Sequence, residues 1–183
     1  MRLFLTILSI FFIILFIFSC HKKDSEGFTI FKIKRGKHKS SSVLKFTNKK
    51  ELSFKVRFDE SCKYQTLDPV NQWDVNKLFG LSDGGSHIKN SARFGWRWVD
   101  GKLELLAFTH YNGDFFFEKI TELEIGKEYD CVLTIGDKYT FISNGSIVTM
   151  DRYKNNNRRN YYLWPYFGGD EASPQDITIK IKY

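Results

Sequence analysis

Arg93 and Arg97 are the residues of this sequence whose type and spacing best suit an anionic ligand. The stretch Ser91–Val99 alternates apolar and polar residues as a half-buried strand does, so the two arginines share one face. The opposite face carries Ala92, Phe94, Trp96 and Trp98. Guanidinium groups bind carboxylates and sulfates through paired hydrogen bonds. If this face lines a groove, the pair predicts an acidic ligand; on a solvated sheet it would pair with Glu104 or with a carboxylate of another strand.

A second group of side chains could stack on sugars or move protons. The stretch from Leu103 to His110 also alternates, and aromatic residues follow the same spacing from Tyr162 to Tyr166. Aromatic rings beside charged groups suit a sugar-binding groove, because sugars present flat C–H faces. The alternative is that these rings belong to the core. The predicted ligand-binding residues are Arg93, Arg97, Glu104 and Trp164, and the candidates for proton transfer are His110, Tyr162 and Tyr166.

Short alternating segments separated by turns must position these side chains. They cover 28–34, 52–58, 91–99, 103–110, 129–135, 139–143, 146–150, 161–166 and 177–183. Asp100-Gly101, Asn112-Gly113 and Asn144-Gly145 readily supply the positive φ of hairpin turns. No stretch after residue 27 shows a convincing apolar stripe at helical period. About nine strands at hairpin spacing predict an all-β fold, a single antiparallel β-sandwich of jelly-roll type over 28–183.

Acidic residues near the C-terminal end raise the question of a bound cation. Carboxylates and carbonyls of 168–171, together with Asp176, could hold a structural Ca²⁺, which prefers oxygen ligands. An exposed tight turn would use the same residues without a metal. The sequence contains no G-x-S-x-G, no H-E-x-x-H, no P-loop and no paired C-x-x-C. We therefore expect no cofactor, apart from the calcium that this turn could hold.

The first nineteen residues are typical of a cleavable signal peptide. Arg2 precedes an apolar run from Leu3 to Phe18, which is shorter than the roughly 20 residues of a spanning helix. Residues 20–27 would then form a charged tether before the folded domain. The alternative is an uncleaved anchor with an incidental Cys20. In either case the bulk of the chain is expected outside the cytosol.

The charge of the chain indicates the kind of partner. A formal net charge of +7 would predict nucleic acid for a cytosolic protein, but an exported protein does not normally meet it. An acidic polysaccharide is the expected partner, and the alternative is that Lys and Arg only keep the surface soluble. The sequence identifies no protein partner and no oligomeric state. Cys62 and Cys131 could form a disulfide or stay free, and Cys131 is expected to point into the core.

Three motifs resemble known families. Ile17-Phe18-Ser19-Cys20 resembles the bacterial lipobox, which implies that Cys20 is lipidated and holds the protein to the cell envelope, at the outer membrane or cell surface. The segments 77–81 and 91–98, with the hairpin that follows them, and the segment 163–171 resemble jelly-roll polysaccharide lyases of the glucuronan and alginate type. Phe79 stands where that family has proline. The stretch from Pro165 to Ile177 is similar to the ending of small uncharacterised Bacteroidota lipoproteins.

These resemblances leave three functions open, because one fold hosts many activities. They are a lipoprotein that binds acidic polysaccharide, a polysaccharide lyase, and a structural envelope protein. A lyase removes the proton α to a uronate carboxylate, which requires a group that neutralises the carboxylate and a Tyr or His that moves protons. The residues of matching type are Arg93, Arg97, His110 and one of Tyr162 or Tyr166.

Overall fold

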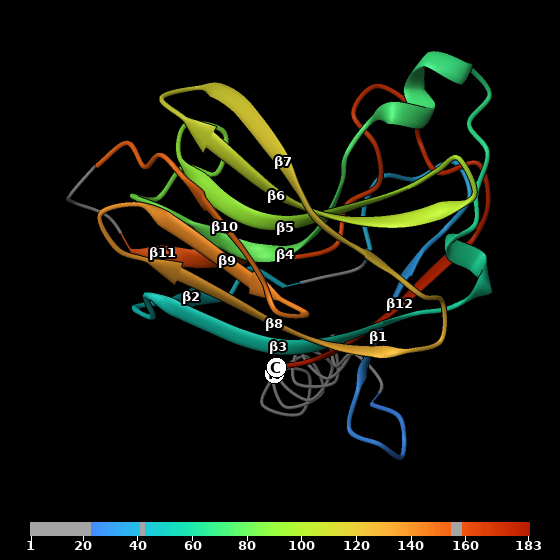
Figure 1. The fold of residues 1–183 in the computed structure, drawn as a ribbon, viewed down its shortest axis with the longest axis horizontal. Helices are drawn as coiled ribbons and strands as arrows, with labels where there is room; N and C mark the ends of the chain where they lie inside the picture. The colour runs from blue at the N-terminus through green and yellow to red at the C-terminus, as the bar shows by residue number, and fades with distance from the viewer. Residues whose placement is uncertain (1–22, 41–42, 155–158) are drawn as a thin grey trace, which may run out of the picture.

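The chain folds into two antiparallel sheets packed face to face (Figure 1). This computed structural model describes residues 23–40, 43–154 and 159–183. Within these parts, the first sheet, called the β3 sheet, has six strands in the order β1 (Thr29–Ile33), β12 (Ile177–Lys182), β3 (Glu51–Phe58), β8 (Glu128–Ile135), β9 (Tyr139–Ser143) and β10 (Ser146–Met150). The second, called the β5 sheet, has the order β2 (Phe46–Thr47), β11 (Asn160–Leu163), β4 (Asn76–Ser82), β5 (Ser91–Val99), β6 (Lys102–Tyr111) and β7 (Asp114–Leu123). The predicted β-sandwich is confirmed.

Alternation places the core between the sheets. Ala92, Phe94 and Trp96 of β5 are fully buried there, as their spacing predicts. Rings from the two sheets meet edge to face: Phe54 of β3 packs against Phe94 with ring centroids 5.4 Å apart. Such contacts stabilise the pair of sheets beyond the area that they bury.

The three predicted hairpin turns are confirmed. Asp100, Asn112 and Asn144 have φ of 52°, 52° and 50°, and each is followed by a glycine with positive φ. Two successive residues in the left-handed region form the turn that matches the twist of paired strands. These turns join β5 to β6, β6 to β7, and β9 to β10.

Three strands, β2, β4 and β7, were not predicted as strands, and one was predicted too long. β2 has only two residues, too few to show alternation. β7 has no apolar alternation, because it lies at the edge of its sheet and most of its side chains are exposed. β4 is buried on both faces and includes Gly80, so it also lacks alternation. β11 ends at Leu163, and Tyr166 beyond it makes isolated bridges to Lys39 and to Lys77.

Two 3₁₀ turns, η1 (Glu60–Cys62) and η2 (Pro69–Trp73), lie in the long connection from β3 to β4. η2 stands on the side of the β5 sheet that faces away from the β3 sheet (Figure 1). Cys62 of η1 and Cys131 of β8 are both buried and both free. The disulfide that was left open is therefore not formed, whereas the inward position of Cys131 is confirmed.

The predictions for the N-terminal segment concern residues 1–27, of which the structure describes only residues 23–27. The signal peptide and Cys20 lie outside the described residues. In the described residues no helix is long and apolar enough to cross a membrane. Asp24 and Glu26, from the expected tether, contact the sandwich, Asp24 through Lys180 at 3.0 Å and Glu26 through Arg57 at 2.6 Å.

Candidate functional site

A groove of about 550 Å³ lies on the outer face of the β5 sheet. It is lined by Trp73, Asp74, Val75, Lys77, Phe108, His110, Phe115, Phe117, Gly169 and Asp170. In Figure 1, η2 rises on one side of this face and β7 on the other. The groove is therefore a surface hollow with a sheet as its floor and two walls.

Strand register sets the order of the side chains on the floor. Ser91 pairs with His110 and His110 with Phe115, which forms one row across β5, β6 and β7. Arg93, Phe108 and Phe117 form the next row. Residues directly opposite each other in antiparallel strands project from the same face, so the members of each row are neighbours. The predicted outward faces of β5 and β6 thus become the floor of a groove.

The η2 wall is built from residues 73–77 and the loop 166–171. Gly95 lets Val75 approach the floor, because a Cβ on Gly95 would lie 2.4 Å from Val75 Cγ1. Gly169 makes the same allowance for Asp74, whose carboxylate accepts a hydrogen bond from the Gly169 N–H. Glu171 accepts hydrogen bonds from the N–H groups of Leu67 and Asp68 and so anchors the chain just before η2. Lys77 and the loop 166–171, which belong to two segments singled out in the sequence, therefore lie together at this wall.

Lys77 crosses the floor from β4 toward β6. Its backbone pairs with Gly95, and its Nζ lies 4.9 Å from the ring centroid of Phe108. Nζ donates a hydrogen bond to the carbonyl of Gly168 at 3.0 Å. Burial, with the positive charge of Arg93 adding to it, lowers the pKa of Lys77 to about 8. The amine is thus a poorly solvated cation that lines the groove.

Arg93 reaches the same aromatic ring from β5. Its guanidinium carbon lies 5.9 Å from the centroid of Phe108, and one Nη donates to the carbonyl of His87 at 3.3 Å. Nε is buried without a hydrogen-bond partner. Burial lowers the pKa of Arg93 to about 10, an effect partly offset by Tyr161 and Tyr166. An incompletely paired buried cation is costly, and an arriving anion would offset that cost.

His110 stands at the end of the floor beside Phe115. Its Nδ1 lies 3.2 Å from the hydroxyl of Ser91, and its ring packs edge-on against Phe108. Burial and then the charges of Arg93 and Lys77 lower the pKa of His110 to about 4. The imidazole is consequently neutral at pH 7.

Sequence reasoning missed His87 and Tyr161. The Tyr161 hydroxyl lies 2.7 Å from Nδ1 of His87 and accepts a hydrogen bond from the His87 N–H. Together they fix the loop whose carbonyl contacts Arg93. Alternation along 160–163 could have identified Tyr161, because it places Tyr161 and Tyr162 on opposite faces of the strand. His87 lies in a loop, where no alternation of apolar and polar residues indicates its position.

Several predicted site residues lie elsewhere. Tyr162 faces the core, stacked on Phe79 at 5.8 Å, so its candidacy for proton transfer is wrong. Trp164 is half-buried and stacks on the same core ring with centroids 5.2 Å apart, so it packs against the core and does not line the groove. The core position that the sequence left open as the alternative therefore holds for Tyr162, whose backbone pairs with the buried Leu81. Tyr166 is half-buried, with its ring stacked on His38 and its backbone paired with Lys77.

Arg97 and Glu104 pair with each other. Arg97 Nε donates to Glu104 Oε2 at 2.7 Å, and Lys119 contacts the other oxygen of Glu104 at 2.8 Å. This is the ion-pair alternative that the sequence left open. The two arginines therefore share a face, as predicted, but only Arg93 is short of partners.

The acidic residues near the C-terminal end have protein partners of their own. Asp176 contacts Lys34 at 2.6 Å, and Glu171 accepts from backbone N–H groups. Among the described residues, no three His, Cys, Asp or Glu side chains are grouped to hold a metal. The structure thus favours the tight-turn interpretation for 168–171.

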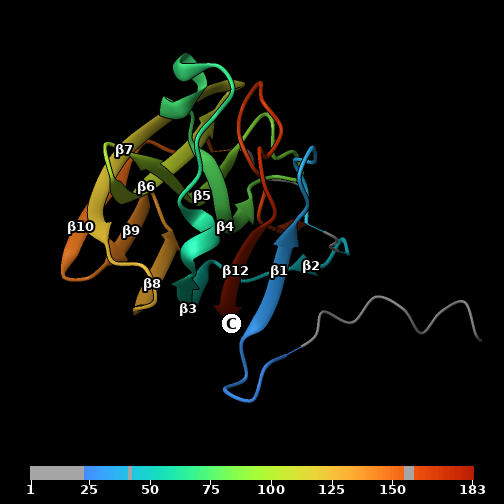
Figure 2. The same ribbon diagram turned by 90° about the vertical axis from the view of Figure 1, so that its right-hand side faces the viewer.

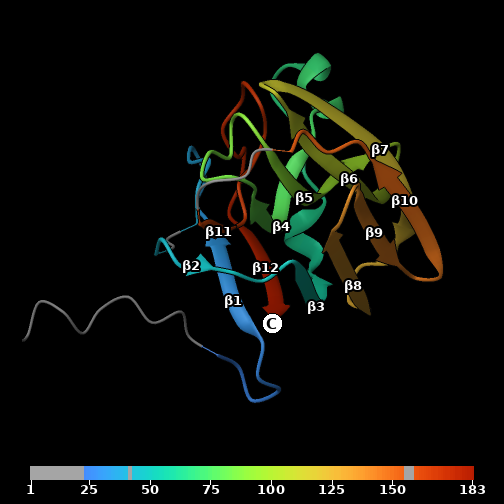
Figure 3. The ribbon, with the colours of Figure 1, turned by 90° about the vertical axis from the view of Figure 1, so that its left-hand side faces the viewer.

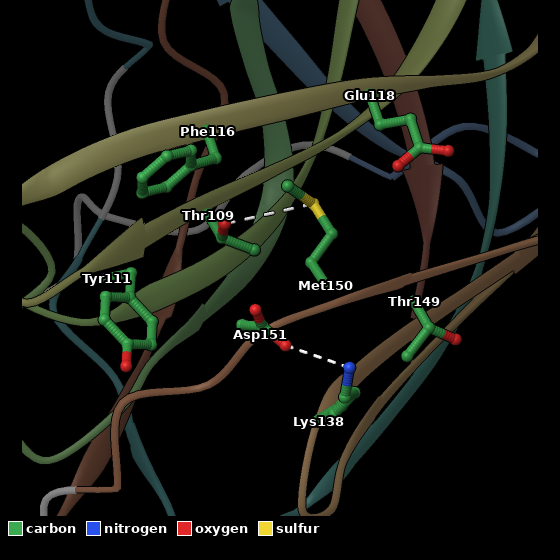
Figure 4. Close-up of a pocket in the computed structure, with 8 residues that line it drawn as sticks. All are labelled: Thr109, Tyr111, Phe116, Glu118, Lys138, Thr149, Met150 and Asp151. Atoms are coloured by element: carbon green, nitrogen blue, oxygen red, sulfur yellow. Dashed lines mark hydrogen bonds and ion pairs between the residues drawn. The ribbon is translucent and has the colours of Figure 1, made fainter.

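A second hollow of about 500 Å³ opens between the edge strands β7 and β10. Its lining includes Phe116, Glu118 and Met150, with the ion pair of Lys138 and Asp151 at its rim (Figure 4). Figure 3 shows these two strands next to one another at the same side of the sandwich. Phe116 and Phe117 point to opposite faces of β7, so the two hollows are separate.

Comparison with known proteins identifies the class of fold. No protein-family model and no curated protein matches the sequence. The chain is similar to a variant of alginate lyase A1-II′, with a TM-score of 0.52 and 11% identity over 91% of this chain and 82% of that one. The class is therefore a β-sandwich of the kind found in that lyase.

Two further solved structures are less similar. An alginate lyase from Pseudomonas aeruginosa has a TM-score of 0.49 and 9% identity over 73% of this chain and 61% of that one, so this chain spans about three fifths of its length. Carbohydrate-binding module CBM66 from Bacillus subtilis has a TM-score of 0.40 and 13% identity over 88% of this chain and 90% of that one. At these identities a resemblance concerns the fold alone.

Proposed function

We propose that this protein binds acidic polysaccharide in the groove on the β5 sheet. One observation carries the proposal: Lys77 and Arg93 direct two positive charges at the ring of Phe108. Among the described residues no carboxylate forms an ion pair with either of them. Asp74 and Asp170 also line the groove and act on Lys77 without pairing with it. Two like charges held together beside Phe108 favour an anion from solution.

The groove also offers the apolar surface that a sugar needs. Phe108 and Phe115 stack in parallel at 5.9 Å, and Phe115, Phe117 and Trp73 expose their rings along the walls. Flat rings beside fixed cations can receive the C–H face and the carboxylate of one uronate together. The fold of alginate lyase A1-II′ supports a polysaccharide as the ligand by analogy only.

A lyase activity is the second candidate, and the neutral imidazole of His110 favours it. In this reaction His110 would take the proton from the carbon α to the carboxylate, while Arg93 neutralises the carboxylate. The bond from the β carbon to the glycosidic oxygen would break, a carbon–carbon double bond would form, and the leaving oxygen would gain a proton. Tyr166 is a candidate donor, since it is half-buried and its backbone pairs with Lys77 of the groove.

One experiment separates these functions. The full-length protein, purified in a mild detergent, would be mixed with alginate, polygalacturonate, a sulfated glycan and a neutral glucan. Calorimetry measures binding, and ultraviolet absorbance measures unsaturated uronate products. Binding of the acidic polymers without products supports the first function, and products support the second. If neither occurs, the groove is not an acidic-polysaccharide site, and the structural envelope role remains.

We further propose that Cys20 is lipidated and holds the protein to the bacterial envelope, with the sandwich outside the cytosol. The support is the apolar run before Cys20 and the resemblance of 17–20 to a lipobox. Multiple acyl chains give durable attachment to a membrane.

Replacing this cysteine tests the anchor. Cys20→Ala should abolish labelling with a radioactive fatty acid and release the protein from the membrane fraction or leave it as a precursor. Cys62→Ala is the matched control, because Cys62 is buried in the sandwich. Unchanged labelling of Cys20→Ala would refute the assignment.

A further inference from the structure

Two exposed aromatic side chains line the groove, one from each wall. Trp73 comes from the end of η2 and is 52% exposed, and Phe117 comes from β7 and is 45% exposed. Both line the groove. Exposed rings of this size at a groove wall determine how far a chain of sugars can extend along it.

Arg97 joins the two walls from below. Its guanidinium carbon lies 5.2 Å from the ring of Trp73 and 5.9 Å from the ring of Phe117. One Nη also donates to the Trp73 carbonyl at 2.9 Å. Stacking on an aromatic face and bonding to its backbone hold the guanidinium in one position.

The ion pair under this stack makes it rigid. Arg97 bonds to Glu104, and Lys119 bonds to the same carboxylate, so the guanidinium is fixed at both ends. Burial of Glu104 would by itself raise its pKa, but hydrogen bonds from Lys119 and Arg97 turn the net shift downward and keep the carboxylate ionised. A bridge with one cation and two aromatic rings therefore connects η2 to β7 across the floor.

We infer that this stack of Trp73, Arg97 and Phe117 closes one end of the groove, so that the site takes the terminus of an acidic polysaccharide and excludes internal stretches. The inference rests on the proposed binding function and deepens it. The groove lies on the Lys77 and His110 side of the stack. At the end of the groove away from the stack, Phe115 lies beside His110 and is 61% exposed. We place the exit of the sugar chain at this end.

The number of protein molecules bound per polysaccharide chain tests this inference. The probe is alginate fractionated into samples of defined length, titrated into the full-length protein by calorimetry. A closed groove recognises one kind of chain end, so one protein should bind per chain at every length. An open groove would bind along the chain, and the number per chain would rise with length, which would overturn the inference while leaving the binding function in place. No binding at any length would count against both.

Two variants locate the closure. Trp73→Ala and Phe117→Ala should each open the end, and the number of proteins bound per chain should then rise with chain length. Phe116→Ala is the matched control: it is the same residue type on the same strand, 52% exposed, and it points into the other hollow (Figure 4). The control should keep one protein per chain. If the Trp73 and Phe117 variants keep that ratio, or lose binding altogether, the stack does not close the groove.

Discussion

At the scale of single residues, two arginines with the same sequence signal have different surroundings. Arg97 is held by Glu104, the Trp73 carbonyl and two rings, whereas Arg93 makes one hydrogen bond of 3.3 Å and leaves Nε unpaired. The sequence pattern predicted the shared face and offered Glu104 of β6 as a partner, but it carried no information about the backbone partners, which come from η2 and from the loop 83–90. A residue pattern can thus predict which face a side chain occupies, and only the tertiary contacts decide whether it is available to a ligand.

We expect Arg93→Ala to weaken acidic-polysaccharide binding by about 1.5–3 kcal/mol, the usual contribution of hydrogen bonds to charged groups. The melting temperature should change little, because Arg93 has one weak bond within the protein. Calorimetric titration and thermal unfolding of the same samples measure both quantities. Arg97→Ala should show the reverse order, with a lower melting temperature, since it removes an ion pair and the stack. Equal losses of stability in the two variants would contradict this distinction.

Lys77 should make binding depend on pH. Its pKa is lowered to about 8 by burial and by Arg93, so the amine loses its charge as the pH rises through that value. A bound anion favours the charged amine, and affinity should therefore be constant below about pH 7 and fall by up to about tenfold per unit above about pH 8. Calorimetric titrations at a series of pH values from below about pH 7 to above about pH 8 measure this slope. Lys77→Met should bind more weakly and show no slope in this range, because uronate carboxylates stay ionised throughout.

At the scale of elements, the parts that sequence predicts well are those with one buried face and a defined turn. β5, β6 and the Asp100-Gly101 turn were predicted almost to the residue, because alternation and turn chemistry agree there. β7 was missed because an edge strand with two exposed faces needs no alternation. Since β7 supplies Phe115 and Phe117, the second wall of the groove could not be predicted from the sequence pattern.

The η2 wall depends on one carboxylate. Glu171 accepts hydrogen bonds from Leu67 N–H, Asp68 N–H and Asn71 Nδ2, and these bonds hold its pKa below the usual range. We expect Glu171→Ala to speed amide hydrogen exchange in 67–73 and to weaken glycan binding. Removing such a capping group costs about 1 kcal/mol locally. Asp170→Ala is the neighbouring control and should leave exchange in that segment unchanged; equal protection in both variants would show that Glu171 does not anchor η2.

At the scale of the whole molecule, one buried ion pair joins the two sheets. Asp83 follows β4 of the β5 sheet, and it accepts hydrogen bonds from Arg152, which follows β10, and from Tyr139 of β9. Its side chain is only 4% exposed. The pair therefore links strands that are far apart in sequence and fixes the start of the loop that carries His87.

Breaking this link should be costly for stability. Asp83→Ala leaves the Arg152 charge without its partner, and we expect the free energy of unfolding to fall by about 3–5 kcal/mol. The double variant Asp83→Leu with Arg152→Met removes both charges and should lose less. Denaturant unfolding of the three proteins measures the difference. A loss below about 1 kcal/mol in Asp83→Ala would mean that solvent reaches the pair and screens it.

The place of β12 has a consequence for the order in which the molecule assembles. Residues 177–182 lie between β1 and β3 and pair with both (Figure 2). Until they emerge during synthesis, β1 has no neighbour in its sheet, and strands that meet only across most of the chain close slowly. The hairpins around β5, β6 and β7 are local and can form early. The sandwich is therefore completed last of all by its final strand, so a partly synthesised chain stays open, which is the state that the export proposed above would require.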